Sequence, residues 1–187
     1  MYLVSIYFDE KTNKKIQKFI NQVAEKTGNT FMLDGNVPPH ITVSAFEALK
    51  EEQVIEALLH VSTNLRKDSL QWVSVGQFFP YVLYITPVLN EYLHDMSVQI
   101  STALSKIDGV KISPYYQPFQ WLPHSTIGKT LTKEQMRIAF EVMQSSFGTF
   151  EGQVVRIGLA KPNPHRDIMS WELSSSALPL VCNSGYR

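Results

Sequence analysis

The chain has 187 residues, of which 44% are hydrophobic and 18% charged, so it is long enough for a folded domain and too apolar to be intrinsically disordered. Its 17 Lys and Arg residues balance 17 Asp and Glu residues, and this zero net charge argues against an extended nucleic-acid footprint, which needs a basic surface. A small nucleotide or the terminus of an RNA needs only a few local cations, so these partners are still allowed.

Strands and helices alternate through the first half of the sequence. Runs rich in β-branched and aromatic residues predict strands at 2–8, 40–46 and about 70–79. Apolar residues at helical spacing predict two helices between these strands, the first ending near Gly28. Their core-facing positions are Ile16, Phe19, Ile20 and Val23, then Val54, Ala57, Leu58, Val61 and Leu65.

The same order recurs in the second half, with strands predicted at 81–87, 122–129 and about 154–160, and a last strand at about 168–174. The intervening helices place these residues on one face: Met96, Ile100, Ala103, Leu104 and Ile107, then Met136, Ala139, Phe140, Met143 and Phe147. Two copies, at about 1–80 and 81–160, predict a single two-lobed domain with a site where the copies meet.

A Pro-His-x-Thr motif occupies the same place in each copy, at 39–42 and 123–126. Because alternate residues of a strand face the same way, the histidine and the threonine of each motif project together. Two such strands side by side would place two imidazoles and two hydroxyls around a volume that fits a phosphate.

These side chains suit displacement at phosphorus. With an ordinary pKa of about 6.5, one imidazole can be neutral and the other protonated near pH 7. The neutral ring would activate a water or hydroxyl, and the charged ring would protonate the departing oxygen. We therefore predict His40 and His124 as catalytic residues, in either order, and Thr42 and Thr126 as donors to the phosphate oxygens.

Both motifs resemble the paired H-x-T/S-hydrophobic signatures of the two-histidine (2H) phosphoesterase superfamily, which includes bacterial RNA 2'-5' ligase-like proteins and RNA 2',3'-cyclic phosphodiesterases. The resemblance covers nearly the whole chain. It implies a bilobal α+β fold with antiparallel sheets around a central cleft and helices on the outside. It also implies metal-free hydrolysis or transfer at 2',3'-cyclic phosphates or 2'-5' linkages, with the two histidines as the acid and base.

Two positions depart from this pattern. Ser125 stands where the family carries an aliphatic residue, and Lys129 stands where bacterial members often carry an arginine. Lysine can contact a phosphate, although without the bidentate geometry of arginine. Strict alternation would turn Lys129 away from the cleft, but Gly128 suggests a bulge that re-aims it towards the phosphate.

The loop 114–121 before the second motif reads Pro-Tyr-Tyr-Gln-Pro-Phe-Gln-Trp. Its aromatic rings could stack on a nucleobase beside the phosphate, or they could cover the core under a long loop. Tyr115 and Tyr116, with polar tips, are better candidates for substrate binding than Trp121.

Other residues give weaker signals. His60 and His94 fall on predicted helices and His165 in a Pro-rich turn, so we expect all three at the surface. The single cysteine, Cys182, excludes an intrachain disulfide and is expected to be incidental. The sequence has no Cys cluster, no H-x-H or H-E-x-x-H motif and no Gly-rich phosphate loop, so we predict neither a metal nor a cofactor.

No apolar run reaches the about 18 residues that cross a bilayer, and the short apolar N-terminus lacks the features of a signal peptide, so we expect no membrane and a cytoplasmic location. The sequence leaves four interpretations open. The first is hydrolysis of a cyclic phosphate or phosphodiester, the second is RNA 2'-5' ligation, and the third is binding of a phosphate or RNA end without catalysis. The fourth is a structural protein whose histidines are coincidental. It does not predict the oligomeric state.

Overall fold

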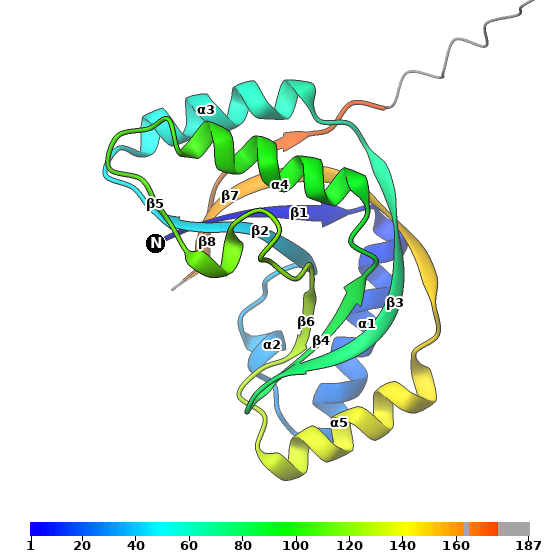
Figure 1. The fold of residues 1–187 in the computed structure, drawn as a ribbon. Helices are drawn as coiled ribbons and strands as arrows, with labels where there is room; N and C mark the ends of the chain where they lie inside the picture. Colours follow the sequence, from blue (N-terminus) through cyan, green and yellow to red (C-terminus); the bar gives the residue numbers. More distant parts are fainter. Residues whose placement is uncertain (163–164, 176–187) are drawn as a thin grey trace, which may run out of the picture.

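The computed structural model describes residues 1–162 and 165–175, and Cys182 lies outside them. An open antiparallel sheet of eight strands curves through the molecule (Figure 1). Helices α3 (Glu51–Asn64) and α4 (Glu91–Leu104) lie at the top, and α1 (Glu10–Thr27) and α5 (Lys133–Ser146) lie in the lower half. This is the mixed α and β fold with an antiparallel sheet that the sequence predicts.

The described strands are β1 (Tyr2–Phe8), β2 (His40–Glu47), β3 (Asp68–Phe78), β4 (Val82–Pro87), β5 (Lys111–Ile112), β6 (Ser125–Gly128), β7 (Phe150–Pro162) and β8 (His165–Glu172). The described helices are α1 (Glu10–Thr27), α2 (Phe31–Asp34), α3 (Glu51–Asn64), α4 (Glu91–Leu104) and α5 (Lys133–Ser146), with a short 3-10 helix η1 (Pro114–Tyr116). No described helix is long and apolar enough to cross a membrane.

The strand order carries the internal repeat. Along the main path the order is β5-β2-β1-β7-β3-β4-β6, and β8 pairs with β7. From β2 to β6 this order is symmetric between the two copies. If each strand is replaced by its equivalent in the other copy (β1 and β4, β2 and β6, β3 and β7), the same strands are still paired. The helices follow the same exchange, because α1 contacts α5 and α3 contacts α4. The two sequence copies therefore share one continuous sheet, and each helix pair takes one helix from each copy.

Side-chain chemistry at the helix ends is also repeated. Asp9, directly after β1, accepts a hydrogen bond from the backbone N–H of Thr12 at 3.1 Å and caps α1. Asn90, after β4, caps α4 in the same way through the N–H of Leu93 at 3.0 Å. At its other end α1 stops at Gly28, whose φ of 71° a side chain would disfavour.

The core lies between the sheet and these helices. Alternate residues of β2, Ile41 and Val43, are buried to 0% and 1% exposure and join the same apolar cluster as Ile6 of β1 and Ile16 of α1. Because Ile41 and Val43 face the core, alternation turns His40 towards the other face of the sheet.

The predicted element bounds agree with the structure within a few residues except at two functional positions. β6 begins at Ser125, so His124 precedes the strand instead of lying in it; Pro123 has no N–H to donate, and its carbonyl instead accepts from the Thr86 hydroxyl at 2.7 Å. The predicted turn at His165 is wrong, because this residue begins β8 and pairs with Pro162.

Candidate active site

The two motif histidines are held by the same local hydrogen bond. His40 Nδ1 lies 2.9 Å from the carbonyl oxygen of Pro38, and His124 Nδ1 lies 2.8 Å from that of Leu122. A carbonyl oxygen can only accept, so Nδ1 carries the proton in each ring and Nε2 is the nitrogen left for a ligand. The two imidazoles are therefore fixed in the same tautomer by carbonyls two residues earlier.

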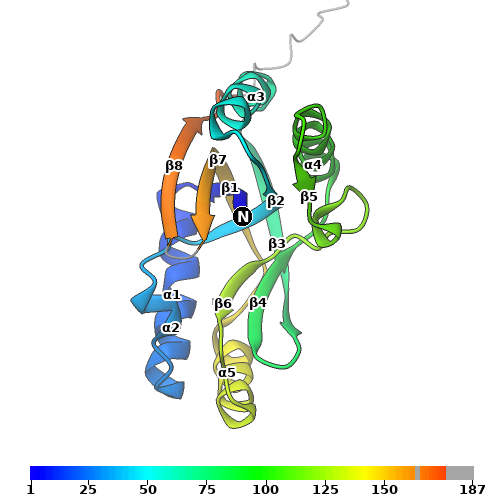
Figure 2. The ribbon, with the colours of Figure 1, turned by 90° about the vertical axis from the view of Figure 1, so that its left-hand side faces the viewer.

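The fold brings these histidines near one another although β2 and β6 lie far apart in the strand order. β2, which begins at His40, contacts β6, which begins directly after His124, and the charge of His124 is one of the influences that lower the pKa of His40. The curvature of the sheet in Figures 1 and 2 accounts for this approach, since it turns β2 and β6 towards each other.

The motif threonines follow their histidines on the same face by alternation. Thr42 is buried at 8% exposure, pairs with Ser5 of β1 and has its hydroxyl oxygen 3.4 Å from the Ser5 hydroxyl oxygen. Thr126 is half-buried and pairs with Tyr84 of β4. Ser125, between His124 and Thr126, is 1% exposed. Its hydroxyl is therefore buried and does not reach the surface beside the side chains of those two residues.

Polar and charged groups surround His40. Its ring centroid lies 6.1 Å from that of Tyr7. The guanidinium of Arg156 lies over the Tyr7 ring, 4.4 Å from the centroid of that ring. His165 Nε2 lies 3.2 Å from Asp167 Oδ1, and the charges of both residues act on His40. Burial, and next the charge of Asp167, raise the pKa of Tyr7 to about 12, so its phenol keeps its proton.

Burial is the largest influence on the pKa of His40 and lowers it. The charge of His165 lowers this pKa further. The hydrogen bond to Pro38 and the Asp167 carboxylate both raise it. The free ring is therefore biased towards its neutral form, and a bound anion would favour its protonation.

Aromatic rings surround His124 instead. Phe78 meets it edge to face at 4.8 Å between centroids, and Tyr84 does so at 5.4 Å. Burial again lowers the pKa, opposed by the hydrogen bond to Leu122. The two histidines thus share a local geometry and differ in their neighbours.

A glycine on the neighbouring strand makes room for the tyrosine beside each histidine. A Cβ at Gly76 of β3 would overlap the ring of Tyr84, and a Cβ at Gly158 of β7 would lie 2.9 Å from Cε2 of Tyr7. The exchange of β3 with β7 relates these two strands. In both cases the tyrosine ring occupies space that a Cβ on the glycine would need.

A pocket of about 380 Å³ adjoins His124. Its lining residues are Phe78, Tyr115, Tyr116, Gln120, Leu122 and His124. Tyr115 is 81% exposed, and burial raises the pKa of Tyr116. The structure therefore brings both predicted tyrosines to the candidate site, whereas Trp121 is buried in the core.

Lys129 is less well placed. It follows the end of β6, is exposed, and has its ammonium 5.6 Å from the centre of the Phe31 ring in α2. The β4–β6 ladder does shift register opposite Gly128, between Leu83 and Tyr84. No contact of Lys129 with either histidine is seen among the described residues.

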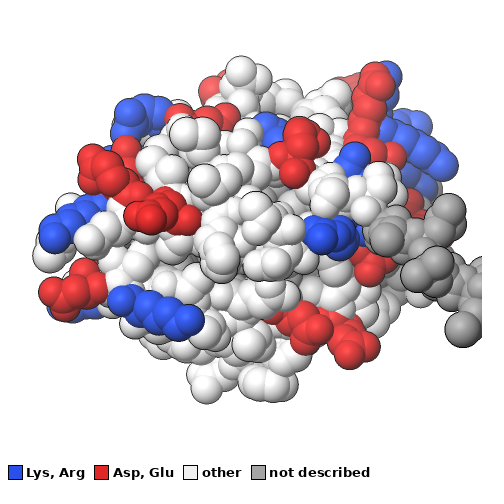
Figure 3. Space-filling view, turned by 90° about the horizontal axis from the view of Figure 1, so that it is seen from above, with Lys and Arg blue, Asp and Glu red and all other residues white. Residues whose placement is uncertain are grey.

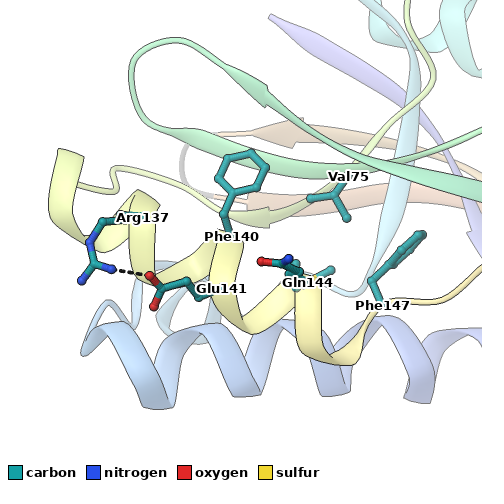
Figure 4. Close-up of a pocket in the computed structure, with 7 residues that line it drawn as sticks. Val75, Arg137, Phe140, Glu141, Gln144 and Phe147 are labelled. Carbon is teal, nitrogen blue, oxygen red and sulfur yellow. Dashed lines mark hydrogen bonds and ion pairs between the residues drawn. The ribbon is translucent and has the colours of Figure 1, made fainter.

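Other hollows lack this chemistry. A pocket of about 650 Å³ lies between α5 and β3, where it is lined by Phe140, Phe147 and Val75, and Arg137 in its wall pairs with Glu141 (Figure 4). His60 lines a separate groove beside α3 whose lining includes none of the candidate site residues, and the ring of His94 lies 4.0 Å from that of Phe119 between centroids.

On the face seen from above, acidic and basic side chains are interspersed, and neither sign forms a continuous field (Figure 3). Among the described residues, no three His, Cys, Asp or Glu side chains cluster as metal ligands.

A family model described as the 2'-5' RNA ligase superfamily matches residues 12–166, a span that includes both motifs. The chain belongs to this superfamily. The 2H fold predicted from the motifs is thereby confirmed. No curated protein matches the chain by sequence.

Solved structures show the same fold. E. coli LigT, solved with 3'-AMP, has a TM-score of 0.58 at 14% identity over 93% of this chain and 98% of LigT. A second structure titled only as a phosphoesterase gives 0.57 at 14% identity, covering 93% and 98%. TT0787 of Thermus thermophilus gives 0.56 at 13% identity, covering 94% and 99%.

Several neighbours of the histidines were not predicted from the sequence. They are Tyr7, Phe78, Tyr84, His165 and Asp167, with Arg156 lying over the ring of Tyr7. The tyrosines could have been found, because each lies on the strand that opens its copy of the repeat, and that strand pairs with the motif strand of the same copy. His165 and Asp167 could not, since their approach depends on how β8 pairs with β7.

Proposed function

We propose that this protein is a metal-independent phosphoesterase that hydrolyses a 2',3'-cyclic phosphate, or a related phosphodiester, of a nucleotide or RNA terminus. One observation carries the proposal. His40 begins β2 and His124 directly precedes β6, both rings are fixed in the same tautomer, and these two strands contact each other. Such a pair supplies one base and one acid from groups that are otherwise equal.

In this reaction the neutral imidazole takes a proton from water, and the water oxygen forms a bond to phosphorus. The bond from phosphorus to one ribose oxygen breaks, and the second histidine, as imidazolium, gives that oxygen its proton. The cyclic ester becomes a monoester, and the histidines end in exchanged protonation states. The hydroxyls of Thr42 and Thr126 donate to the non-bridging oxygens, and Lys129 is a weaker candidate for the same role.

The pocket beside His124 supports a nucleotide as the substrate. Its tyrosines, Tyr115 and Tyr116, offer ring faces on which a base can stack. LigT has been solved with 3'-AMP, ATP and NADP+, which are phosphate-bearing nucleotides. By analogy we propose that this chain also binds a phosphate-bearing nucleotide or RNA end and needs no cofactor.

RNA 2'-5' ligation is the second candidate, because the family model takes its name from that reaction. It uses the same groups, with a ribose hydroxyl replacing water as the attacking oxygen. The two reactions differ in the oxygen that attacks, so an assay that follows both products separates them.

The test is turnover of 2',3'-cyclic nucleotides and cyclic-phosphate-ended oligonucleotides with EDTA present. We expect hydrolysis that survives EDTA and falls by about 10²- to 10⁴-fold in both His40→Ala and His124→Ala. His60→Ala is the matched control, since His60 lies on α3 away from the site. Loss of activity on chelation would disprove the metal-free mechanism, and binding without turnover would favour a module that only binds RNA ends.

A further inference from the structure

Exposed aromatic side chains gather around one part of this molecule. Of the six Phe, Tyr and Trp side chains that are exposed among the described residues, five lie in two short segments: Phe78, Phe79, Tyr81, Tyr115 and Phe119. We call these five the aromatic rim. Phe79, Tyr115 and Phe119 are each more than 80% exposed, so they contribute little to the core and are free to contact a ligand.

The aromatic rim is continuous with the pocket beside His124. Phe78 and Tyr115 line that pocket, and Phe79 and Tyr81 follow Phe78 in the turn between β3 and β4. The β3–β4 turn and the loop that carries η1 lie on the same side of the molecule in both ribbon views (Figures 1 and 2). The aromatic rim therefore includes part of the pocket wall and extends from it into the β3–β4 turn and the loop that carries η1.

Local contacts hold the two segments of the rim. The Gln77 side chain donates to the carbonyl of Pro80 at 3.2 Å, and the carbonyl of Tyr81 accepts from the N–H of Leu131 at 3.1 Å. In the other segment the ring of Phe119 lies against His94 of α4. The exposed rings are thus carried by ordered backbone, which lowers the entropy cost of stacking on them.

The chemistry of the rim fits nucleobases. Stacking on aromatic rings is tolerant of sequence and needs no charge, and no described residue lining the adjoining pocket is Lys, Arg, Asp or Glu. The net charge of the chain is zero, which disfavours binding through many phosphates. A single-stranded RNA whose end reaches the histidines would therefore gain affinity through its bases.

We propose that the aromatic rim stacks on the bases next to the reacting end of a single-stranded RNA, so that the preferred ligand is an oligonucleotide end instead of a free nucleotide. The inference rests on the proposed function for the position of the reacting phosphate. Binding, which needs no turnover, tests it separately.

The experiment compares the Kd of 3'-AMP with that of an RNA tetramer of adenylates ending in a 3'-phosphate. The unaltered protein should bind the tetramer at least about tenfold more tightly, since stacking contributes strongly for each base. Phe79→Ser should reduce this ratio severalfold, Phe79→Tyr should preserve it, and Phe79→Leu, which is apolar without a ring, should reduce it. Leu49→Ser is the matched control, because Leu49 is 85% exposed and lies beside α3.

Salt gives an independent reading. The ratio should change little between about 50 mM and about 200 mM salt if bases provide the gain, and it should fall if extra phosphates provide it. Equal affinity for the two ligands, loss of the ratio with salt, or an equal effect of Leu49→Ser would overturn the proposal.

Two other results separate the alternatives. If the protein is a dimer in solution and Phe79→Ser converts it to a monomer, the aromatic rim is an interface between two copies of this chain. That result would overturn the proposal. Hydrolysis of cyclic phosphates without a preference for the tetramer would also overturn it while the proposed function stands. A tetramer preference without hydrolysis would support the rim and reject the hydrolase.

Discussion

His40 and His124 occupy equivalent positions in the two copies of the repeated motif, yet their neighbours have little in common. His40 is next to Tyr7 and within the electrostatic influence of His165 and Asp167. His124 is enclosed by Phe78 and Tyr84 and opens onto an aromatic pocket. The repeat therefore preserves the two histidines, while their surroundings differ: charged residues lie near His40, and aromatic rings lie around His124.

The divergence separates two tasks. Acid and base catalysis requires two similar groups, which the shared tautomer and the lowered pKa of each histidine supply. Binding a nucleotide requires an asymmetric surface, because a base and a phosphate differ in chemistry. In the proposed function the aromatic side fixes where the nucleobase lies, and the charged side adjusts the ionisation of His40.

The threonines give the largest expected contrast between the two sides. Removing one donor to a developing charge costs roughly 10²- to 10³-fold in kcat, so Thr126→Val should lose about that much. Thr42→Val should lose less, because the hydroxyl of Ser5, 3.4 Å from that of Thr42, can donate in its place. Steady-state kinetics on a cyclic nucleotide measure both.

The double variant Ser5→Ala with Thr42→Val tests the reason for that contrast. It should bring the loss on the His40 side to the level of Thr126→Val. Equal losses in the two single variants would show that Ser5 does not substitute for Thr42.

The glycines beside the tyrosines give the next effect. Gly76→Ala would push the Tyr84 ring off its place against His124, and a displacement of about 1 Å near reacting groups can cost about 10²-fold in rate. Gly158→Ala meets Tyr7 at a longer distance, 2.9 Å from Cβ to Cε2, and should cost less. The measurement is kcat/KM together with Tm.

Gly148→Ala is the matched control, because a Cβ there meets nothing within 4 Å. It should leave kcat/KM and Tm close to their original values. A fall in Tm without a fall in kcat/KM for Gly76→Ala would show that Tyr84 supports the fold only.

The sequence predicted the features that depend on local periodicity. Alternation in β2 placed Ile41 in the core, and the repeated Pro-His-x-Thr motif located both histidines. The comparisons confirm the family and the fold, while the catalytic roles stay predictions.

What the sequence could not predict depends on contacts between distant strands. The surface position expected for His165 rested on a Pro-rich turn, but the pairing of β8 with β7 leaves its side chain only 20% exposed and near His40. The rim residues Phe79 and Tyr81 were expected at the facing ends of two strands, 70–79 and 81–87, but β3 ends at Phe78 and β4 begins at Val82, so both residues lie in the turn. Lys129 was predicted from the family motif, and the structure places its ammonium by Phe31.

The smallest expected effect concerns protonation and distinguishes the two histidines directly. The charge of His165 lowers the pKa of His40 and is not among the influences on His124. His165→Asn removes that charge and also frees the Asp167 carboxylate, which favours the protonated form of His40. The pKa of His40 should therefore rise while that of His124 stays constant, as measured by NMR titration of the imidazole nitrogens, with His60→Asn as the control.

The same variant identifies the base. In a bell-shaped profile of kcat/KM against pH, the acidic limb reports the group that must be neutral and the alkaline limb the group that must be protonated. If the acidic limb moves to higher pH in His165→Asn, His40 is the base; if the alkaline limb moves, His40 is the acid. Either shift should leave the maximum of kcat/KM nearly unchanged, because His165 acts on His40 through charge alone. A profile in which neither limb moves would separate His40 from the rate and contradict the paired roles.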